Sequence, residues 1–299
     1  MPLLIVGSVG IDDIITEEGS AKGVLGGSSS YAAVAAGLFD RVRLVGVVGN
    51  DFPKKYVELY KKKNIDLAGL ETANGKTFRW TGKYAKEFKT RDTLEINLNV
   101  FADFRPKIPA QYKDSPYVLL ANIDPDLQHM VLDQIKKPKF VAVDTMDLWI
   151  NIKRDRVAAL LKRVDLIVMN DEEAALYTGK NNLISAGKEL LKSGVKYAII
   201  KKGSHGAILF SKNSIFQIPA YPLEKVVDPT GAGDSFIGGV MGYAAAKKRS
   251  DEASIRRGIV YGTVAASYNV EAFSLEKLKT VSKADVEKRF KFIASMTKF

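Results

Sequence analysis

The feature that most constrains the fold is a repeated alternation of short apolar runs with helix-like segments. Apolar runs with the length of buried strands occur at residues 3–7, 42–48, 117–121, 140–144, 166–170 and 197–201. Segments with helical patterning lie between them, at residues 28–39, 52–63, 126–136, 153–163, 171–178 and 183–193. This rhythm is typical of parallel strands joined by crossover helices. The sequence therefore predicts a three-layer α/β fold around a central, mainly parallel sheet.

The rest of the chain extends this pattern without starting a second one. Residues 207–210 and 214–218 suggest a hairpin, and helices are predicted at 231–247, 251–268 and 283–296. We find no internal repeat and no low-complexity linker in the sequence. A single domain spanning residues 1–299 is therefore expected.

One region breaks the alternation of strand and helix. Residues 78–86 and 94–102 read as extended strands with no helix between them. In the second strand Leu94, Ile96 and Leu98 share one face, so one covered face and one more polar face are predicted. We interpret residues 74–104 as a small β lid inserted outside the main sheet.

The amino-acid composition excludes several kinds of catalytic and metal-binding site. The chain has no Cys, which excludes disulfides and thiol nucleophiles, and its two His make a His-rich metal site improbable. The formal charge of +11 invites a nucleic-acid partner. However, the basic residues are scattered beside acidic ones on helix-like faces, so no nucleic-acid partner is predicted. Neither a signal peptide nor a run of about 18 apolar residues is seen, which predicts a cytoplasmic protein with no membrane partner.

The segment with the clearest chemistry is VVDPTGAGDSF at residues 226–236. Small residues at Gly231, Ala232 and Gly233 open a helix, where unpaired amides and the helix dipole favour a phosphate. Asp234, in the first turn of that helix, could accept the proton of an attacking alcohol, and the dipole is expected to keep it ionised. The alternative is an ordinary tight turn in which Asp234 only favours the helix start.

Residues 228–236 resemble the C-terminal signature of the ribokinase-like (PfkB-type) carbohydrate kinases. Other landmarks of that family are matched along the chain. They are Asp12 after Gly7-Ser8, the pair Gly26-Gly27 before SSSYAAVAAGLF, GVVGND at 46–51, Asn170-x-x-Glu173, and Lys201-x-Gly203-x-x-Gly206.

The resemblance implies an ATP-dependent kinase that phosphorylates a hydroxymethyl group. In that reading Asp234 is the catalytic base, and the backbone of Gly231, Ala232, Gly233 and Asp234 stabilises the transferring phosphoryl group. The remaining roles are as follows: Asp12, Gly26 and Gly27 bind the acceptor; Asn170, Lys201, Gly203 and Gly206 bind the nucleotide; Glu173 holds Mg²⁺, partly through water; Asp228 and Thr230 lie near K⁺. The resemblance also implies that the β lid forms the contact of a homodimer.

Several of these positions have plain structural alternatives. Lys201 could simply be a solvated loop residue, and Gly203 and Gly206 could serve only the path of the backbone. Trp80 and Tyr84 of the lid could cover a ligand ring or merely pack within the lid. Asp12, Asp144, Asn170 and Asp228 all follow strands, so they are predicted near one edge of the sheet, where ligands bind in α/β folds.

Position 31 differs from the pattern of the family, which usually has an Asn there that hydrogen-bonds the substrate, whereas this chain has Tyr31. A phenol cannot reproduce the paired donor and acceptor of an amide. Tyr31 could stack on an acceptor ring or fill the interface between helix and sheet. A small sugar is predicted first as the acceptor, a nucleoside with an adenosine- or inosine-type 5′-hydroxyl is the alternative, and a non-catalytic nucleotide or sugar sensor is a third possibility.

Overall fold

A nine-stranded sheet forms the centre of the molecule, in the computed structural model that describes residues 2–88 and 90–298. Its strand order is β13-β12-β11-β10-β9-β8-β1-β4-β5. The strands are β1 (Leu3–Val6), β4 (Val42–Gly49), β5 (Ile65–Ala73), β8 (Tyr117–Leu120), β9 (Phe140–Asp144), β10 (Leu166–Asn170), β11 (Tyr197–Lys201), β12 (Ala207–Ser211) and β13 (Ile215–Ile218). Pairing is parallel except along the β11–β12–β13 meander. The predicted α/β fold is confirmed.

Helices cover both faces of this sheet. They are α1 (Ser28–Ala36), α2 (Lys54–Lys62), α3 (Pro125–Gln134), α4 (Asp147–Ile152), α5 (Arg154–Leu161), α6 (Asp171–Thr178), α7 (Leu183–Lys192), α8 (Ala232–Lys247), α9 (Glu252–Asn269) and α10 (Lys283–Met296). Alternate residues of β1 enter opposite cores, so Leu3 and Ile5 pack with α1, α8 and α9. Leu4 and Val6 belong to the core on the other face, to which α3, α5 and α7 contribute. Burial on both faces explains why the strands are continuous apolar runs.

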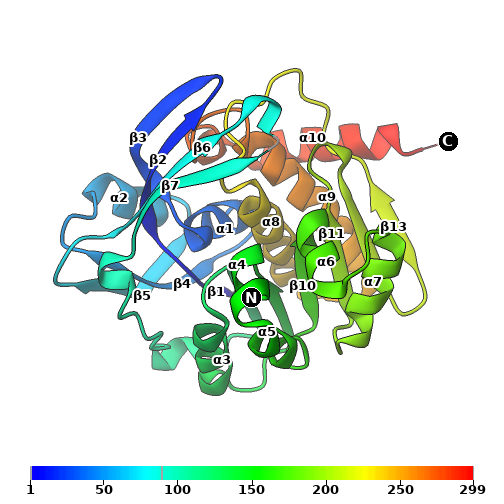
Figure 1. Cartoon of the computed structure of the whole chain (residues 1–299), viewed down its shortest axis with the longest axis horizontal. Helices are drawn as coiled ribbons and strands as arrows, with labels where there is room; N and C mark the ends of the chain where they lie inside the picture. The colour runs from blue at the N-terminus through cyan, green and yellow to red at the C-terminus, as the bar shows by residue number, and fades with distance from the viewer. Residues whose placement is uncertain (1, 89, 299) are drawn as a thin grey trace.

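A second, four-stranded sheet has the order β3-β2-β6-β7. Its strands are β2 (Gly10–Thr16), β3 (Gly19–Gly26), β6 (Phe78–Tyr84) and β7 (Arg91–Asn97). They lie together at the upper left of Figure 1, far from helices α3 and α5 at the bottom. The strands β2 and β3 were not anticipated from the sequence. A bulge between Asp12 and Ile14 breaks the period of two, which is the signal that would have revealed β2.

The predicted lid strands are shorter than expected, and one expectation about them is wrong. The strand β7 ends at Asn97, and residues 99–101 form a 3₁₀ turn. Every residue of β7 is exposed, so neither face is covered within the chain. Leu94 and Ile96 are 55% and 56% exposed. The apolar alternation therefore describes a free surface at the edge of the sheet.

Two further elements are absent from the sequence prediction. The edge strand β5 mixes buried and exposed residues, and its register with β4 shifts between Arg43 and Val45, so it lacks a clear period. Helix α4 is only six residues long and runs almost directly into α5. Within the described residues, no helix is both long and apolar enough to cross a bilayer.

Candidate active site

The glycine turn leads into α8, and its geometry requires glycine. Gly231 has φ +73°, the left-handed region, and is the N-cap of α8. A Cβ at Gly231 would lie 2.2 Å from the ring of Tyr31, which packs against this backbone. The amides of Gly233 and Asp234 are in the first helical turn, where no intrahelical acceptor exists. The Ala232 amide, in contrast, donates to the Pro229 carbonyl at 3.1 Å. An anion-binding role for residues 231–234 remains a prediction.

Asp234 is half-buried in the first turn of α8, and loss of hydration raises its pKa to about 7. The charge of Asp144 raises it as well, while Lys201 and Arg91 oppose the shift. The expectation that the helix dipole keeps Asp234 fully ionised at neutral pH is therefore wrong. Loss of hydration and a neighbouring carboxyl outweigh the dipole. A carboxyl with a pKa near neutrality is well suited to accept a proton.

Asp228 organises the chain just before the glycine turn. It is fully buried, and its Oδ1 accepts from the Thr230 amide at 2.8 Å. Its Oδ2 accepts from the Ser274 amide, also at 2.8 Å. Thr230 Oγ1 donates to Tyr84 Oη at 3.1 Å, which joins the lid to the turn. These bonds give Asp228 and Thr230 a structural role, and the K⁺ site remains a prediction.

The acceptor-side residues gather under the lid. Asp12 lies within β2 rather than in a loop, and it is buried against Gly26, whose Cβ would sit 2.0 Å from the carboxyl. Gly27 has φ +92° and begins α1, which carries Tyr31. Burial raises the pKa of Asp12 well above its usual range, and the charges of Asp228 and Asp234 add to this. The carboxyls of Asp228 and Asp234 therefore lie close enough to Asp12 to disfavour its ionised form.

Two polar atoms on this side lack a partner. Asp12 Oδ1 and Tyr31 Oη are buried, and neither makes a hydrogen bond of ordinary length and angle among the described residues, although the Ser274 side chain lies close enough to Tyr31 to oppose the rise in the pKa of its phenol. Buried polar groups are normally paired, so these two atoms indicate a site suited to the polar groups of a ligand. A hydroxyl-bearing acceptor would satisfy both.

On the other side of the turn, Asn170 and Glu173 form a capping box at the start of α6. Asn170 Oδ1 accepts from the Glu173 amide at 2.7 Å, and Glu173 Oε2 accepts from the Asn170 amide at 2.8 Å. The Asn-x-x-Glu spacing thus has a local structural function. It leaves the Asn170 amide nitrogen and the second Glu173 oxygen available to a ligand.

Gly203 and Gly206 shape the loop after β11. Gly203 has φ +52° with open space where a Cβ would lie, and Gly206 has φ +84°. A Cβ at Gly206 would collide with the Ile218 carbonyl at 2.0 Å. Both glycines are therefore required by the backbone, and a nucleotide-binding role remains a prediction.

Lys201 is not a solvated loop residue. It is the last residue of β11, and only 19% of its side chain is exposed. A Cβ at Gly233 would lie 2.7 Å from Lys201 Nζ, so the ammonium rests on the glycine turn. Its ion-pair partner is Asp144 at the end of β9, with 3.6 Å between Nζ and Oδ1.

Two residues of the site had only a weak signal in the sequence. Asp144 follows a predicted strand, which places it at the ligand edge but does not show that it meets Lys201. Tyr84 lies in the lid and reaches Thr230 across 146 positions of sequence. Contacts of this kind depend on the lid folding over the sheet.

The residues present fit Mg²⁺ only in part. Among the described residues no three carboxylate or His side chains are grouped to hold a metal ion. Glu173 offers one free oxygen, and burial raises its pKa to about 7, a shift that a nearby cation would reverse. Mg²⁺ commonly binds through one or two carboxylates with water and phosphate oxygens. Glu173 is thus compatible with a metal that arrives with the nucleotide.

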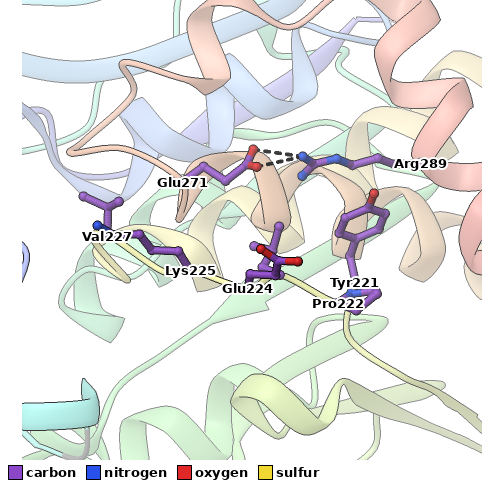
Figure 2. A pocket seen from close by; sticks show the side chains of 8 residues that line it. Tyr221, Pro222, Glu224, Lys225, Val227, Glu271 and Arg289 are labelled. Atoms are coloured by element: carbon purple, nitrogen blue, oxygen red, sulfur yellow. Dashed lines mark hydrogen bonds and ion pairs between the residues drawn. The ribbon is translucent and has the colours of Figure 1, made fainter.

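A hollow of about 470 Å³ on the surface lies apart from this chemistry. It is lined by Tyr221, Pro222, Leu223, Glu224, Lys225, Val227, Glu271 and Arg289. Figure 2 shows Arg289 paired with Glu271, through two hydrogen bonds of 2.9 Å. None of the predicted site residues lines this hollow, so we do not assign the reaction to it.

A half-buried carboxyl lies beside a glycine turn at a helix N-terminus, with an ammonium against the same turn, and this arrangement is suited to phosphoryl transfer to an alcohol. Comparison with known proteins agrees. The chain belongs to the pfkB family of carbohydrate kinases, whose sequence model matches residues 5–278. It is therefore an ATP-dependent kinase, as the resemblance in the motifs predicted.

Three relatives illustrate this likeness. Cytidine kinase of Thermococcus kodakarensis is 29% identical over 266 residues, covering 87% of this chain and 94% of that protein. The nucleoside kinase of Burkholderia thailandensis, solved with inosine, has a TM-score of 0.80 at 19% identity over 98% of this chain and 99% of that one. A double-mutant fructokinase of Vibrio cholerae, solved with fructose, ADP and potassium ion, has a TM-score of 0.81 at 17% identity over 97% and 98%. The two structures establish the shared fold.

Proposed function

We propose that this protein is a nucleoside kinase that transfers the γ-phosphoryl group of ATP to a 5′-hydroxyl. The observation that carries the proposal is the buried pair of unpartnered atoms, Asp12 Oδ1 and Tyr31 Oη, on the acceptor side of Asp234. An acceptor with two ribose hydroxyls would satisfy them. The order of preference between sugar and nucleoside is thereby reversed from the sequence-based expectation.

Two further observations support a nucleoside over a free sugar. Tyr84 of the lid is only partly buried and is bonded to Thr230 beside the glycine turn, whereas the Tyr31 ring is 1% exposed and packs on Gly231. Aromatic rings offer a nucleobase a face to stack on. Among the relatives, the cytidine kinase matches almost the whole chain, and the Burkholderia enzyme was solved with inosine. A free sugar remains the second candidate, because the fructokinase shares the fold.

The proposed step follows from the residues of the site. The acceptor oxygen bonds to the γ-phosphorus, its proton passes to Asp234, and the bond to the bridging oxygen breaks with its electron pair leaving on ADP. The amides of Gly231, Gly233 and Asp234 would stabilise charge on the transferring group. The Ala232 amide donates to the Pro229 carbonyl at 3.1 Å and is not available for this. Mg²⁺ bound with the nucleotide, beside Glu173, would neutralise phosphate charge. Asp12 and Tyr31 orient the acceptor, and Asn170, Gly203 and Gly206 contact the nucleotide.

The test is ADP release from purified protein given ATP, Mg²⁺ and a panel of acceptors. Cytidine, adenosine, inosine, ribose and fructose form the panel, with 5′-deoxyadenosine as the matched control that lacks the reacting hydroxyl. Faster release with at least one nucleoside than with either sugar is expected. Turnover with sugars alone would restore the sugar as acceptor. Nucleotide binding with no turnover on any member would favour the sensor.

The cation and the dimer belong to the same proposal. We expect K⁺ near Asp228 and Thr230, so replacing K⁺ with tetramethylammonium should slow turnover, and an unchanged rate would remove this site. A homodimer through the exposed edge of β7 would cover Leu94 and Ile96. Ile96→Glu should halve the mass measured by light scattering, whereas Ile184→Glu, on the exposed surface of α7, should not. A wild-type mass of one chain would refute the dimer.

A further inference from the structure

The end of α9 and the residues that follow it lie against the glycine turn. Asn269, the last residue of α9, is fully buried, and its Nδ2 donates to the Thr230 carbonyl at 2.7 Å. Its Oδ1 accepts from Ser235 Oγ, at the start of α8, at 3.2 Å. One side-chain amide therefore joins the residue before Gly231 to the residue after Asp234.

The backbone of the same segment holds the residues that lead into the turn. The Val270 carbonyl accepts from the amides of Val227, at 2.8 Å, and Asp228, at 3.3 Å. Further along the segment, the Ser274 amide donates to the Asp228 carboxylate at 2.8 Å. We call residues 269–274 the support segment, because its bonds reach the chain on both sides of the glycine turn.

Arg289 of α10 holds the support segment in place. Its Nη2 donates to both carboxylate oxygens of Glu271 at 2.9 Å, and its Nη1 donates to Ser267 Oγ at 2.8 Å. The guanidinium carbon lies 3.6 Å from the ring centre of Tyr268 and 4.4 Å from that of Tyr221, which are cation–π distances. Figure 2 shows Arg289 extended toward Glu271, with the Tyr221 ring beside it. Arg289 therefore ties α10 to the end of α9 and to the support segment.

Burial distinguishes this contact from an ordinary surface ion pair. Only 12% of the Arg289 side chain and 26% of the Glu271 side chain are exposed. Exposed ion pairs contribute little to stability, whereas a largely buried pair is costly to break by removing one partner. Loss of the Arg289 guanidinium is therefore expected to loosen the segment that holds the turn.

We propose that Arg289 is a positioning residue for phosphoryl transfer, because it holds the support segment and thereby keeps the amides of the glycine turn where they meet the transferring group. This inference rests on the proposed function of the turn and extends it to the C-terminal helix. Gly231 and Gly233 have no side chains of their own to pack, so the place of the turn depends on bonds from neighbouring segments. A misplacement of about 1 Å in catalytic geometry costs on the order of a hundredfold in rate.

Steady-state kinetics of Arg289→Met, with ATP and the acceptor that the panel identifies, test the inference. We expect kcat to fall about tenfold or more and both KM values to change by less than about threefold, because the weakened interaction is made in the transition state. Arg289→Lys keeps a cation near Glu271 and should recover part of the rate. If Arg289→Met did not fold, Glu271→Gln, which weakens the same pair, carries the same expectation. Circular dichroism at the assay temperature shows that each variant is folded.

Arg256 provides a matched control in the same chain. Its Nη2 donates to Glu252 Oε1 at 2.6 Å, and its guanidinium carbon lies 5.3 Å from the ring centre of Phe216. This arginine lies near the start of α9, about 20 Å along the helix from Asn269. Arg256→Met should lower the urea unfolding midpoint and leave kcat unchanged.

Hydrogen exchange provides a measurement that does not depend on turnover. The backbone amides of residues 227–236 should exchange faster in Arg289→Met than in the wild-type protein, because the support segment holds them less firmly. Mass spectrometry of the peptide that covers these residues measures the rate. The same peptide should exchange at the wild-type rate in Arg256→Met.

Unchanged exchange of residues 227–236 in Arg289→Met, or an unchanged kcat, would overturn the inference. Equal changes in Arg256→Met would also overturn it, because the effect would then be a general loss of stability. If the wild-type protein turned over no acceptor, the proposed function would be refuted with the catalytic part of this inference. The exchange experiment would still decide whether Arg289 holds the turn, so the two failures are distinguishable.

Discussion

Replacing Asp234 with Asn should abolish turnover and also stabilise the fold at neutral or alkaline pH. Burial and the charge of Asp144 raise the pKa of Asp234 from about 3.8 to about 7. Each tenfold change in proton affinity is worth about 1.4 kcal/mol. Keeping Asp234 ionised therefore lowers the free energy of unfolding by roughly 4 kcal/mol. This is an upper figure for the gain expected in Asp234→Asn, because the variant also removes one of the three carboxyls that act on Lys201.

The sign of the pH dependence follows from proton binding. Because the pKa is raised in the folded state, the folded protein binds more protons than the unfolded chain between about pH 4 and pH 7. The contribution of Asp234 to stability therefore falls as the pH rises through this window, and its full cost is present above pH 7. Asp234→Asn removes that cost at pH 8 and changes little at pH 4.

Urea unfolding midpoints at pH 8 and pH 4 measure the effect. The expected result is a higher midpoint for Asp234→Asn than for wild type at pH 8, with the difference shrinking at pH 4. Glu172→Gln, at an exposed carboxyl of α6, is the matched control and should show no such gain. If Asp234→Asn were equally stable or less stable than wild type at pH 8, the burial argument for the base would be refuted.

Three other predictions concern catalysis and the turn. The wild-type kcat/KM should fall below about pH 7, roughly tenfold per pH unit below pH 6, as Asp234 is protonated. The pKa of Glu173 is also raised to about 7, so the same profile measured on Glu173→Gln separates the two carboxyls. A midpoint near pH 4 would contradict the assignment of Asp234 as the base. Tyr31→Phe should raise the acceptor KM about tenfold and leave the ATP KM unchanged, because it removes only an unpartnered hydroxyl; steady-state kinetics decide, and an unchanged acceptor KM would make Tyr31 structural. Gly231→Ala should lower both kcat and the unfolding midpoint more than Gly179→Ala does. An alanine at either position of positive φ costs about 1–2 kcal/mol of backbone strain, but only at Gly231 would its Cβ also lie 2.2 Å from the Tyr31 ring. Equal losses in the two variants would show that the contact with Tyr31 has no effect.

Local patterns predicted most of the main sheet and its helices. The segment 171–178 was predicted with the bounds that α6 has, and the structure shows a capping box of neighbouring residues at its start, which is a local signal. The lid was predicted only from residues 74–104, since the bulge in β2 breaks the period of two there. The period is clear in β7, but it does not show that both faces of this strand are exposed. Edge and lid strands take their shape from partners far along the chain.

The sequence by itself determined the α/β class, the glycine turn before α8 and the identity of the carboxyl that follows it, since each depends on neighbours within a few residues. Only the tertiary structure decided that Lys201 rests on Gly233 beside Asp144, that Tyr84 reaches Thr230, and that Asp234 is buried enough to hold a proton near neutrality. The reason is physical: hydration, charge and close contact depend on which distant segments the fold brings together, and a linear pattern does not encode those distances.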